Sequence, residues 1–201
     1  MQLTIDEAYL PVKLTATPMS DEEFAEFCTL YPDHFIEMTA EGEIVIMPPN
    51  YSFTGAQSGE IFGQLRDWAS GGRRGIATDS SGGFLLPNGA RLAPDAAWTL
   101  KSRIPGSSAE RRRKYWKLSP DFVVELRSDT DRLPVLRAKL QEWIDNGARL
   151  AWLIDPEREA VEIYRAGQKP DVRIGIQSIA GEGPVEGFVL DLRRVWDPLA
   201  D

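Results

Sequence analysis

The segment Pro120–Arg127, which reads PDFVVELR, decides how this chain folds. The apolar run Phe122–Leu126 within it predicts a buried β-strand, and successive side chains of a strand point to opposite faces. Glu125 and Arg127 therefore share one face, while the other face is apolar. An ionised acid in such a strand is costly unless a metal ion or a cation neutralises it, so Glu125 is a candidate site residue. The alternative is a structural Arg–Glu pair inside the sheet.

A helix and a second buried strand follow this segment. The spacing of apolar residues predicts the helix over Leu133–Asn146, and the almost continuous apolar run Arg149–Ile154 predicts a strand buried on both faces. Lys139 lies on the flank of the helix's apolar stripe, three residues after Leu136 and four before Trp143. A lysine placed there faces the edge of the sheet, where it would stay charged beside carboxylates. The alternative is a boundary lysine whose amine reaches solvent.

An acidic side chain also stands in an upstream segment. Asp95 follows Pro94 in Leu92–Trp98, which reads LAPDAAW. Its alternative explanation is a turn aspartate, which is common next to proline. Glu37, in an expected hairpin, and Glu60, on an expected helix, are candidates for a supporting ligand. Each of these two is also explained as a solvated surface acid.

These residues suit a metal centre for phosphodiester hydrolysis. Such a centre combines carboxylates that hold one or two Mg²⁺ ions with a cation that stabilises the charge growing on the phosphate. Asp95 and Glu125 would supply the carboxylates, and the backbone carbonyl of Leu126 another oxygen ligand. Lys139 would orient the attacking water or steady the phosphate, while Arg127 would contact phosphate or brace the strand acid.

The rest of the chain predicts one α/β domain with a mixed sheet over residues 18–201, after a loosely attached arm over residues 1–17. An N-terminal β-hairpin is expected from two short apolar runs around a turn. The expected elements, besides those above, are a helix from Ser20, strands Phe35–Met38 and Glu43–Met47, a helix Thr54–Ala69, strands Gly75–Asp79, Gly83–Leu86, Arg91–Trp98, Val161–Arg165, Arg173–Ile179 and Gly187–Leu192, and a short helix Leu192–Trp196.

Composition excludes several classes of protein. A chain of 201 residues that is 42% hydrophobic can bury a substantial core. We expect a soluble, cytoplasmic protein, because no apolar run is long enough for a membrane span and no secretion signal is present. The single cysteine, Cys28, excludes a disulfide framework and a multi-cysteine zinc site. No phosphate-binding or dinucleotide-binding glycine motif occurs.

The net charge of −8 argues against a non-specific DNA coat, because phosphate affinity usually comes from lysine and arginine. An acidic catalytic site would itself add to this negative count. Positive charge is concentrated in Arg73–Arg74 and Arg111–Lys114, which could contact a nucleic-acid backbone. The alternative for both runs is a solvated loop.

The ordered motifs also resemble a known family. LAPDAAW at 92–98, PDFVVELRS at 120–128, Lys139, and NGARLAWLIDP at 146–156 are similar to the Uma-two family of proposed restriction endonucleases, which is placed in the PD-(D/E)XK nuclease superfamily. Further matches are GEIVIMPP at 42–49 and GFVLDL at 187–192. The resemblance covers about residues 18–197.

This resemblance implies a restriction-endonuclease-like core, in which helices flank a mixed central β-sheet, with the N-terminal hairpin added. Asp95 resembles the family's motif aspartate and Glu125 its second acid. The superfamily's lysine normally follows two residues later, where this chain has Arg127, and in this family the lysine comes from the next helix as Lys139. Glu60 is the nearest match to the acid often found on the first core helix. A histidine often found after the MPP segment is replaced by YSF.

The implied activity is Mg²⁺-dependent hydrolysis of DNA phosphodiester bonds, with Mn²⁺ as a possible substitute. A homodimer is expected, because two copies of a site are the simplest way to cut two strands. The rival interpretation is a catalytically inactive binding or regulatory module that keeps the nuclease fold. The acidic composition and the arginine at the usual lysine position both favour this rival.

Overall fold

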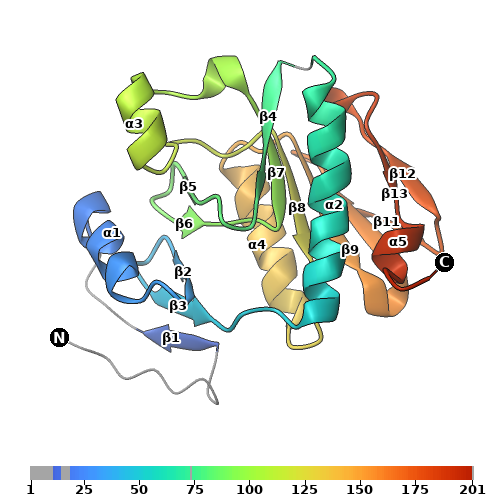
Figure 1. The fold of residues 1–201 in the computed structure, drawn as a ribbon, viewed down its shortest axis with the longest axis horizontal. Coiled ribbons are helices and arrows are strands. Elements are labelled where there is room, and N and C mark those ends of the chain that lie inside the picture. The colour runs from blue at the N-terminus through green and yellow to red at the C-terminus, as the bar shows by residue number, and fades with distance from the viewer. Residues whose placement is uncertain (1–10, 15–18, 73, 201) are drawn as a thin grey trace.

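A six-stranded mixed sheet forms the centre of the molecule (Figure 1). The computed structural model describes residues 11–14, 19–72 and 74–200. The strand order is β11-β10-β9-β8-β7-β4; β8 and β9 are parallel, and every other pair is antiparallel. The strands are β4 (Gly75–Asp79), β7 (Ala96–Leu100), β8 (Phe122–Leu126), β9 (Leu150–Asp155), β10 (Ala160–Tyr164) and β11 (Asp171–Ile174). This arrangement confirms the predicted mixed sheet.

Helix α4 (Leu133–Asp145) connects the two parallel strands and covers one face of the sheet. Pro134 is tolerated in its first turn, where the missing N–H has no helical acceptor. After the helix, Gly147 has φ +107°, a conformation that glycine adopts without a Cβ penalty. The buried side chains of α4 are the three of the predicted apolar stripe and one neighbour: Leu136, Leu140, Trp143 and Ile144.

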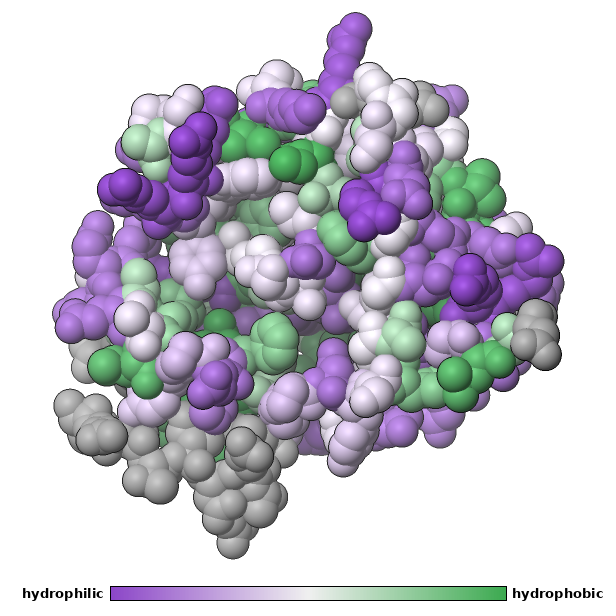
Figure 2. Space-filling view, viewed as in Figure 1, coloured by the Kyte–Doolittle hydropathy of each residue, from purple (hydrophilic) through white to green (hydrophobic). Residues whose placement is uncertain are grey.

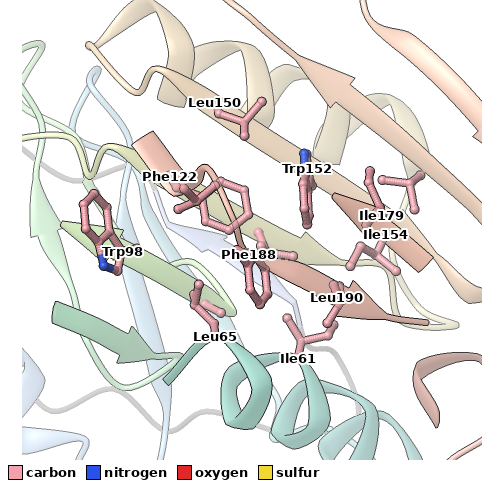
Figure 3. Close-up of a cluster of buried hydrophobic side chains, with 14 of the residues drawn as sticks. Ile61, Leu65, Trp98, Phe122, Leu150, Trp152, Ile154, Ile179, Phe188 and Leu190 are labelled. Atoms are coloured by element: carbon pink, nitrogen blue, oxygen red, sulfur yellow. The ribbon is translucent and has the colours of Figure 1, made fainter. Parts of the chain in front are cut away.

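Helix α2 (Ser52–Ser70) covers the opposite face, together with the C-terminal segment. That segment forms a two-stranded ribbon, β12 (Ser178–Ala180) with β13 (Val189–Asp191), and the short helix α5 (Arg193–Trp196). Figure 3 shows the aromatic side chains of Phe122, Trp152 and Phe188 between the sheet and α2. The rings of Trp152 and Phe188 are stacked with centroids 6.1 Å apart. The uncharged face of β8, formed by Phe122, Val124 and Leu126, therefore lies in this core.

A second sheet, of five strands, lies beside the central one. The predicted hairpin is present as β2 (Phe35–Met38) and β3 (Ile44–Met47), but it is only part of a larger unit. The full order is β1-β3-β2-β6-β5, and helix α1 (Asp21–Leu30) packs against it through Phe24. The added strands are β1 (Val12–Leu14), β5 (Phe84–Leu85) and β6 (Arg91–Leu92).

The strand predicted over Arg91–Trp98 is divided between the two sheets. Its first part is β6, which pairs with β2 and β5, and its second part is β7, which pairs with β4 and β8. The chain crosses from one sheet to the other through residues 93–95. This crossing places Asp95 at the junction of the sheets.

The predicted N-terminal arm lies largely outside the described residues. Within it, Val12–Leu14 form β1, which pairs with β3, so this part is not loosely attached. The basic stretch after β7 contains the 3-10 helix η2 (Lys101–Arg103) and the short helix α3 (Ser108–Arg113). Two further 3-10 helices are η3 (Pro156–Arg158) and η4 (Gly183–Val185). Of the helices that the structure describes, none is long and apolar enough to cross a membrane.

Candidate active site

Asp95 is fixed at the junction of the sheets by the strand that carries the second acid. Its Oδ2 accepts a hydrogen bond of 2.7 Å from the backbone N–H of Leu126, at the end of β8. Burial raises the pKa of the Asp95 carboxyl to about 6, although this N–H and the charge of Lys139 oppose the rise. The carboxyl therefore loses its proton less readily than an exposed aspartate does.

Glu125 projects from β8 toward α4 and is almost entirely buried, with 3% of its surface exposed. Its Oε1 accepts a hydrogen bond of 2.7 Å from the indole Nε1 of Trp143. Its two carboxylate oxygens lie 3.1 and 3.2 Å from Nζ of Lys139. Burial raises the pKa of Glu125 to about 8 in spite of the nearby ammonium, and the charges of Asp95 and Glu37 add to the rise. The Glu125 carboxyl therefore loses its proton much less readily than an exposed glutamate does.

Lys139 lies on the flank of α4 and points toward the sheet, as its position in the helix predicted. Its Nζ donates to the carbonyl oxygen of Ala93 at 3.1 Å and lies 2.9 Å from Oε1 of Glu37. Burial opposes its charge, but the carboxylates of Glu125 and Glu37 outweigh that effect and raise the pKa of Lys139 above its ordinary value. Lys139 therefore carries a positive charge among three carboxylates.

Glu37 is the third of these carboxylates, and sequence reasoning assigned it no firm role. It lies on β2, is 6% exposed, and accepts a hydrogen bond of 2.9 Å from the backbone N–H of Ala93. The crossing residues 93–95 thus contact both Glu37 and Lys139. The sequence left two interpretations open for Glu37, a supporting ligand or a solvated surface acid. Its burial results from the packing of the second sheet against the central one, which local sequence does not encode.

The four side chains line one pocket of about 420 Å³ that also includes Leu126. Figure 2 shows the molecular surface hollowed near its middle, where the second sheet meets the central one. The acids offer only oxygen atoms as metal ligands, and oxygen is the ligand that Mg²⁺ and Mn²⁺ prefer. Within the described ranges, however, no three His, Cys, Asp or Glu side chains are positioned to hold an ion together. The arrangement suits a cation that takes two protein carboxylates and keeps positions for water or phosphate.

The structure does not bring two of the predicted site residues into this pocket. Arg127 lies on the expected face, yet its guanidinium forms ion pairs with Asp155 at 3.1 Å and Glu157 at 2.6 Å. Glu60 accepts a hydrogen bond of 3.1 Å from Gln64 and faces α5 through Arg194. Arg127 therefore connects β8 to the end of β9, and Glu60 lies on the helix that covers the far face of the sheet.

Comparison with known proteins identifies a family and a similar fold. A family model described as "Uma2: Putative restriction endonuclease" matches residues 21–193. A crystal structure described as "a putative nuclease belonging to DUF820 from Anabaena variabilis ATCC 29413" superposes with a TM-score of 0.74 at 18% sequence identity, covering 91% of this chain and 100% of that one. The similarity confirms the predicted nuclease fold. No curated protein matches the chain. The expected homodimer and cytoplasmic location stay predictions.

Proposed function

This chain belongs to the Uma2 family of "Putative restriction endonuclease" proteins, and from that premise we propose that it is a divalent-metal-dependent endonuclease that hydrolyses DNA phosphodiester bonds. The observation that carries the proposal is the convergence of Glu37, Asp95 and Glu125 around Nζ of Lys139, at the junction of two sheets. Four chemically active side chains from separate elements are held there by specific hydrogen bonds.

The residues present fit Mg²⁺ or Mn²⁺. Asp95 and Glu125 would hold the ion, and the backbone carbonyl of Leu126, which lines the same pocket, is the third oxygen ligand we propose. Mg²⁺ usually binds through one or two carboxylates and retains several waters, so a larger set of protein ligands is unnecessary. A bound ion would activate water and neutralise charge on the phosphate. Burial of both acids supports the assignment, because a divalent cation would compensate their charge.

The protein's own contribution is to hold these groups in place. Trp143 donates to Oε1 of Glu125 and Lys139 donates to Oε2, so both oxygens of this acid are held in place. The Leu126 N–H fixes one oxygen of Asp95 in the same way. Lys139 supplies a fixed positive charge that would steady a phosphate or orient water, and Glu37 limits where that ammonium can lie. Such preorganised charge is a large part of catalysis in buried sites.

Arg127 and Glu60 receive different roles in this proposal. Arg127 is held by two acids, one at the end of β9 and one in η3, so we propose that it braces this part of the sheet instead of contacting phosphate. Glu60, paired with Gln64 and facing Arg194, is proposed as a surface acid outside the site. Both are useful comparisons in a test, because each keeps a charge near the core without lining the pocket.

The proposal is tested by incubating supercoiled plasmid with the full chain and Mg²⁺ or Mn²⁺. We expect nicking that chelation of the metal abolishes. Glu125→Gln and Asp95→Asn should each lower the rate by at least about a hundredfold, while Glu60→Gln retains it. Calorimetric titration with Mn²⁺ gives a second readout. The ion should bind wild type and fail to bind a variant that combines Asp95→Asn with Glu125→Gln. A chain that binds no ion and cuts no DNA would instead be the non-catalytic module.

A further inference from the structure

One exposed aromatic side chain lines the catalytic pocket, and a second directly follows a residue that lines it. Among the large hydrophobic side chains that the structure describes as exposed, three are aromatic: Phe35 at 42%, Tyr51 at 74% and Phe53 at 44%. Phe35 lines the pocket, and Asn50, immediately before Tyr51, lines it as well. Exposed apolar residues that gather at one place usually mark a binding surface. A planar ring left in solvent beside a nuclease site is suited to stack on a nucleic-acid base.

Basic side chains line a neighbouring hollow. A second hollow, of about 720 Å³, is lined by Arg112 and Arg113 of α3 and shares Cys28, Gly83 and Tyr115 with the catalytic pocket. The two hollows are therefore neighbours that share part of their lining. Figure 2 shows strongly hydrophilic residues gathered over α3. This is the segment whose arginine run suggested a contact with a nucleic-acid backbone.

Helix α3 is anchored in a way that leaves part of its charge available. Arg111 donates to the backbone carbonyls of Ile104 at 2.7 Å and Pro105 at 3.2 Å, which fixes the helix to the preceding loop. A capping box between Ser107 and Glu110 fixes its start. Arg112 and Arg113 are exposed, and in the described part of the chain neither forms an ion pair. They are free to meet phosphates.

We infer that the surface around these two neighbouring hollows binds an unpaired DNA strand, with bases stacked on Phe35 and Tyr51 and phosphates against Arg112 and Arg113. The inference rests on the proposed function, because it names the substrate form that the same site receives. In a duplex the bases already stack on one another, so side chains cannot stack on them. In a single strand every base offers its face. The recessed acids also favour a flexible strand, since Glu125 is 3% exposed and a phosphate must enter the pocket to reach it.

The test measures binding separately from cutting. A fluorescent oligonucleotide of about 20 thymidines and the matching duplex are titrated with the full chain at about 0.1 M salt, and anisotropy is recorded with the metal chelated so that no cleavage occurs. We expect the single strand to bind at least about tenfold more tightly than the duplex. Equal or tighter binding of the duplex, or no binding of the single strand, overturns the inference.

Variants locate the interaction. Tyr51→Ala and Phe35→Ala should each weaken binding of the single strand about tenfold, since stacking contributes about that much for each base. Ile174→Ala removes an apolar side chain that is 64% exposed on β11, outside both hollows, and should leave binding unchanged. If Tyr51→Ala and Phe35→Ala both bind like Ile174→Ala, the aromatic residues do not stack on bases and the inference fails.

The charge is tested by a matched pair of double variants. The double variant Arg112→Ala/Arg113→Ala should weaken binding. The slope of its binding constant against salt concentration should also become shallower, by roughly the contribution of one phosphate contact for each arginine. Arg149→Ala with Lys169→Ala removes two other exposed positive charges that line neither hollow, and should change both quantities little. Equal effects of the two pairs would mean that net charge alone acts, and would overturn the assignment of phosphates to α3. Plasmid nicking by wild type is measured in parallel, so that loss of this inference is distinguished from loss of the nuclease proposal.

Discussion

The indole nitrogen of Trp143 lies 2.7 Å from Oε1 of Glu125, so helix α4 holds the acid that strand β8 presents. Trp143 is fully buried, and its ring belongs to the core on this face of the sheet. One side chain thus joins the packing of the helix to the position of a candidate metal ligand. The same helix carries Lys139 one turn earlier, which contacts the same carboxylate. The register of α4 against β8 therefore sets the geometry of the site.

Replacing Trp143 with phenylalanine should separate these two roles. The smaller ring keeps much of the apolar packing but leaves Glu125 without its donor, so we expect a loss of about 2 kcal/mol in the free energy of unfolding. Plasmid nicking should fall by about tenfold or more, because the acid is no longer held in one orientation. Chemical denaturation and a nicking assay measure the two effects. Unchanged nicking in a folded variant would show that Glu125 needs no support from the indole.

Replacing Lys139 with methionine should destabilise the fold strongly. Its side chain is 16% exposed and faces Glu37 and Glu125, whose side chains are 8% and 3% exposed, so its removal leaves two buried acids without the cation that neutralises them. We expect a cost of about 3 kcal/mol. Adding Glu37→Gln should recover part of that loss, and a double-mutant cycle measures the coupling. Lys169→Met, at an exposed position, is the control. A double variant no more stable than Lys139→Met would argue against the Lys139–Glu37 contact.

Divalent metal should stabilise the folded chain. An ion that binds only the native state stabilises it in proportion to the logarithm of its concentration. At a concentration about a hundred times the dissociation constant, the ion adds about 2.7 kcal/mol to the free energy of unfolding. We expect thermal unfolding to shift upward with Mg²⁺ or Mn²⁺ in wild type and in Glu60→Gln, and not in Asp95→Asn combined with Glu125→Gln. An equal shift in that double variant would place the ion elsewhere.

Local patterns in the sequence were sufficient to predict β8, α4 and β9, because each has a clear apolar period and a distinct end. They also placed Lys139 on the inner flank of α4, since helical spacing alone relates it to Leu136 and Trp143. The division of residues 91–98 between two sheets was not predictable in this way. Arg91–Leu92 and Ala96–Leu100 both have strand-like composition, and only long-range pairing with β2 and β8 separates them.

The predicted site was incomplete for the same reason. Glu37 is separated from Lys139 by about half of the chain, and its burial depends on how the second sheet packs on the first. Arg127, directly after β8, was predicted to share a face with Glu125, but its partners Asp155 and Glu157 lie at the end of β9 and in η3. Alternation along a strand gives the face of a side chain; the neighbours that it meets there depend on the order of the strands.

A second charged cluster on the same sheet face should control stability at low pH. Glu162 is 2% exposed, and its carboxylate accepts hydrogen bonds from Nε of Arg137 at 2.9 Å and from the hydroxyl of Tyr164 at 3.0 Å. Burial alone would raise the pKa of Glu162, but these partners outweigh it and hold the pKa below its ordinary value of 4.5. A lowered pKa in the folded state means that the stabilisation is present above the ordinary value and is lost as the pH falls through the folded one.

Glu162→Gln should therefore cost about 1–2 kcal/mol at neutral pH, a modest figure because Arg137 is 45% exposed and solvent screens the pair. The difference from wild type should shrink as the pH falls below 4.5, since the wild-type carboxylate then gains a proton and loses the same interaction. Denaturant titrations of both proteins between neutral and acidic pH measure this difference. Glu60→Gln, on a partly exposed acid, should show little dependence of its effect on pH. The difference in free energy of unfolding between wild type and Glu162→Gln could instead stay constant down to acidic pH. That result would mean that the charge of the carboxylate does not stabilise the fold. The amide introduced by the substitution would then destabilise it through its shape alone.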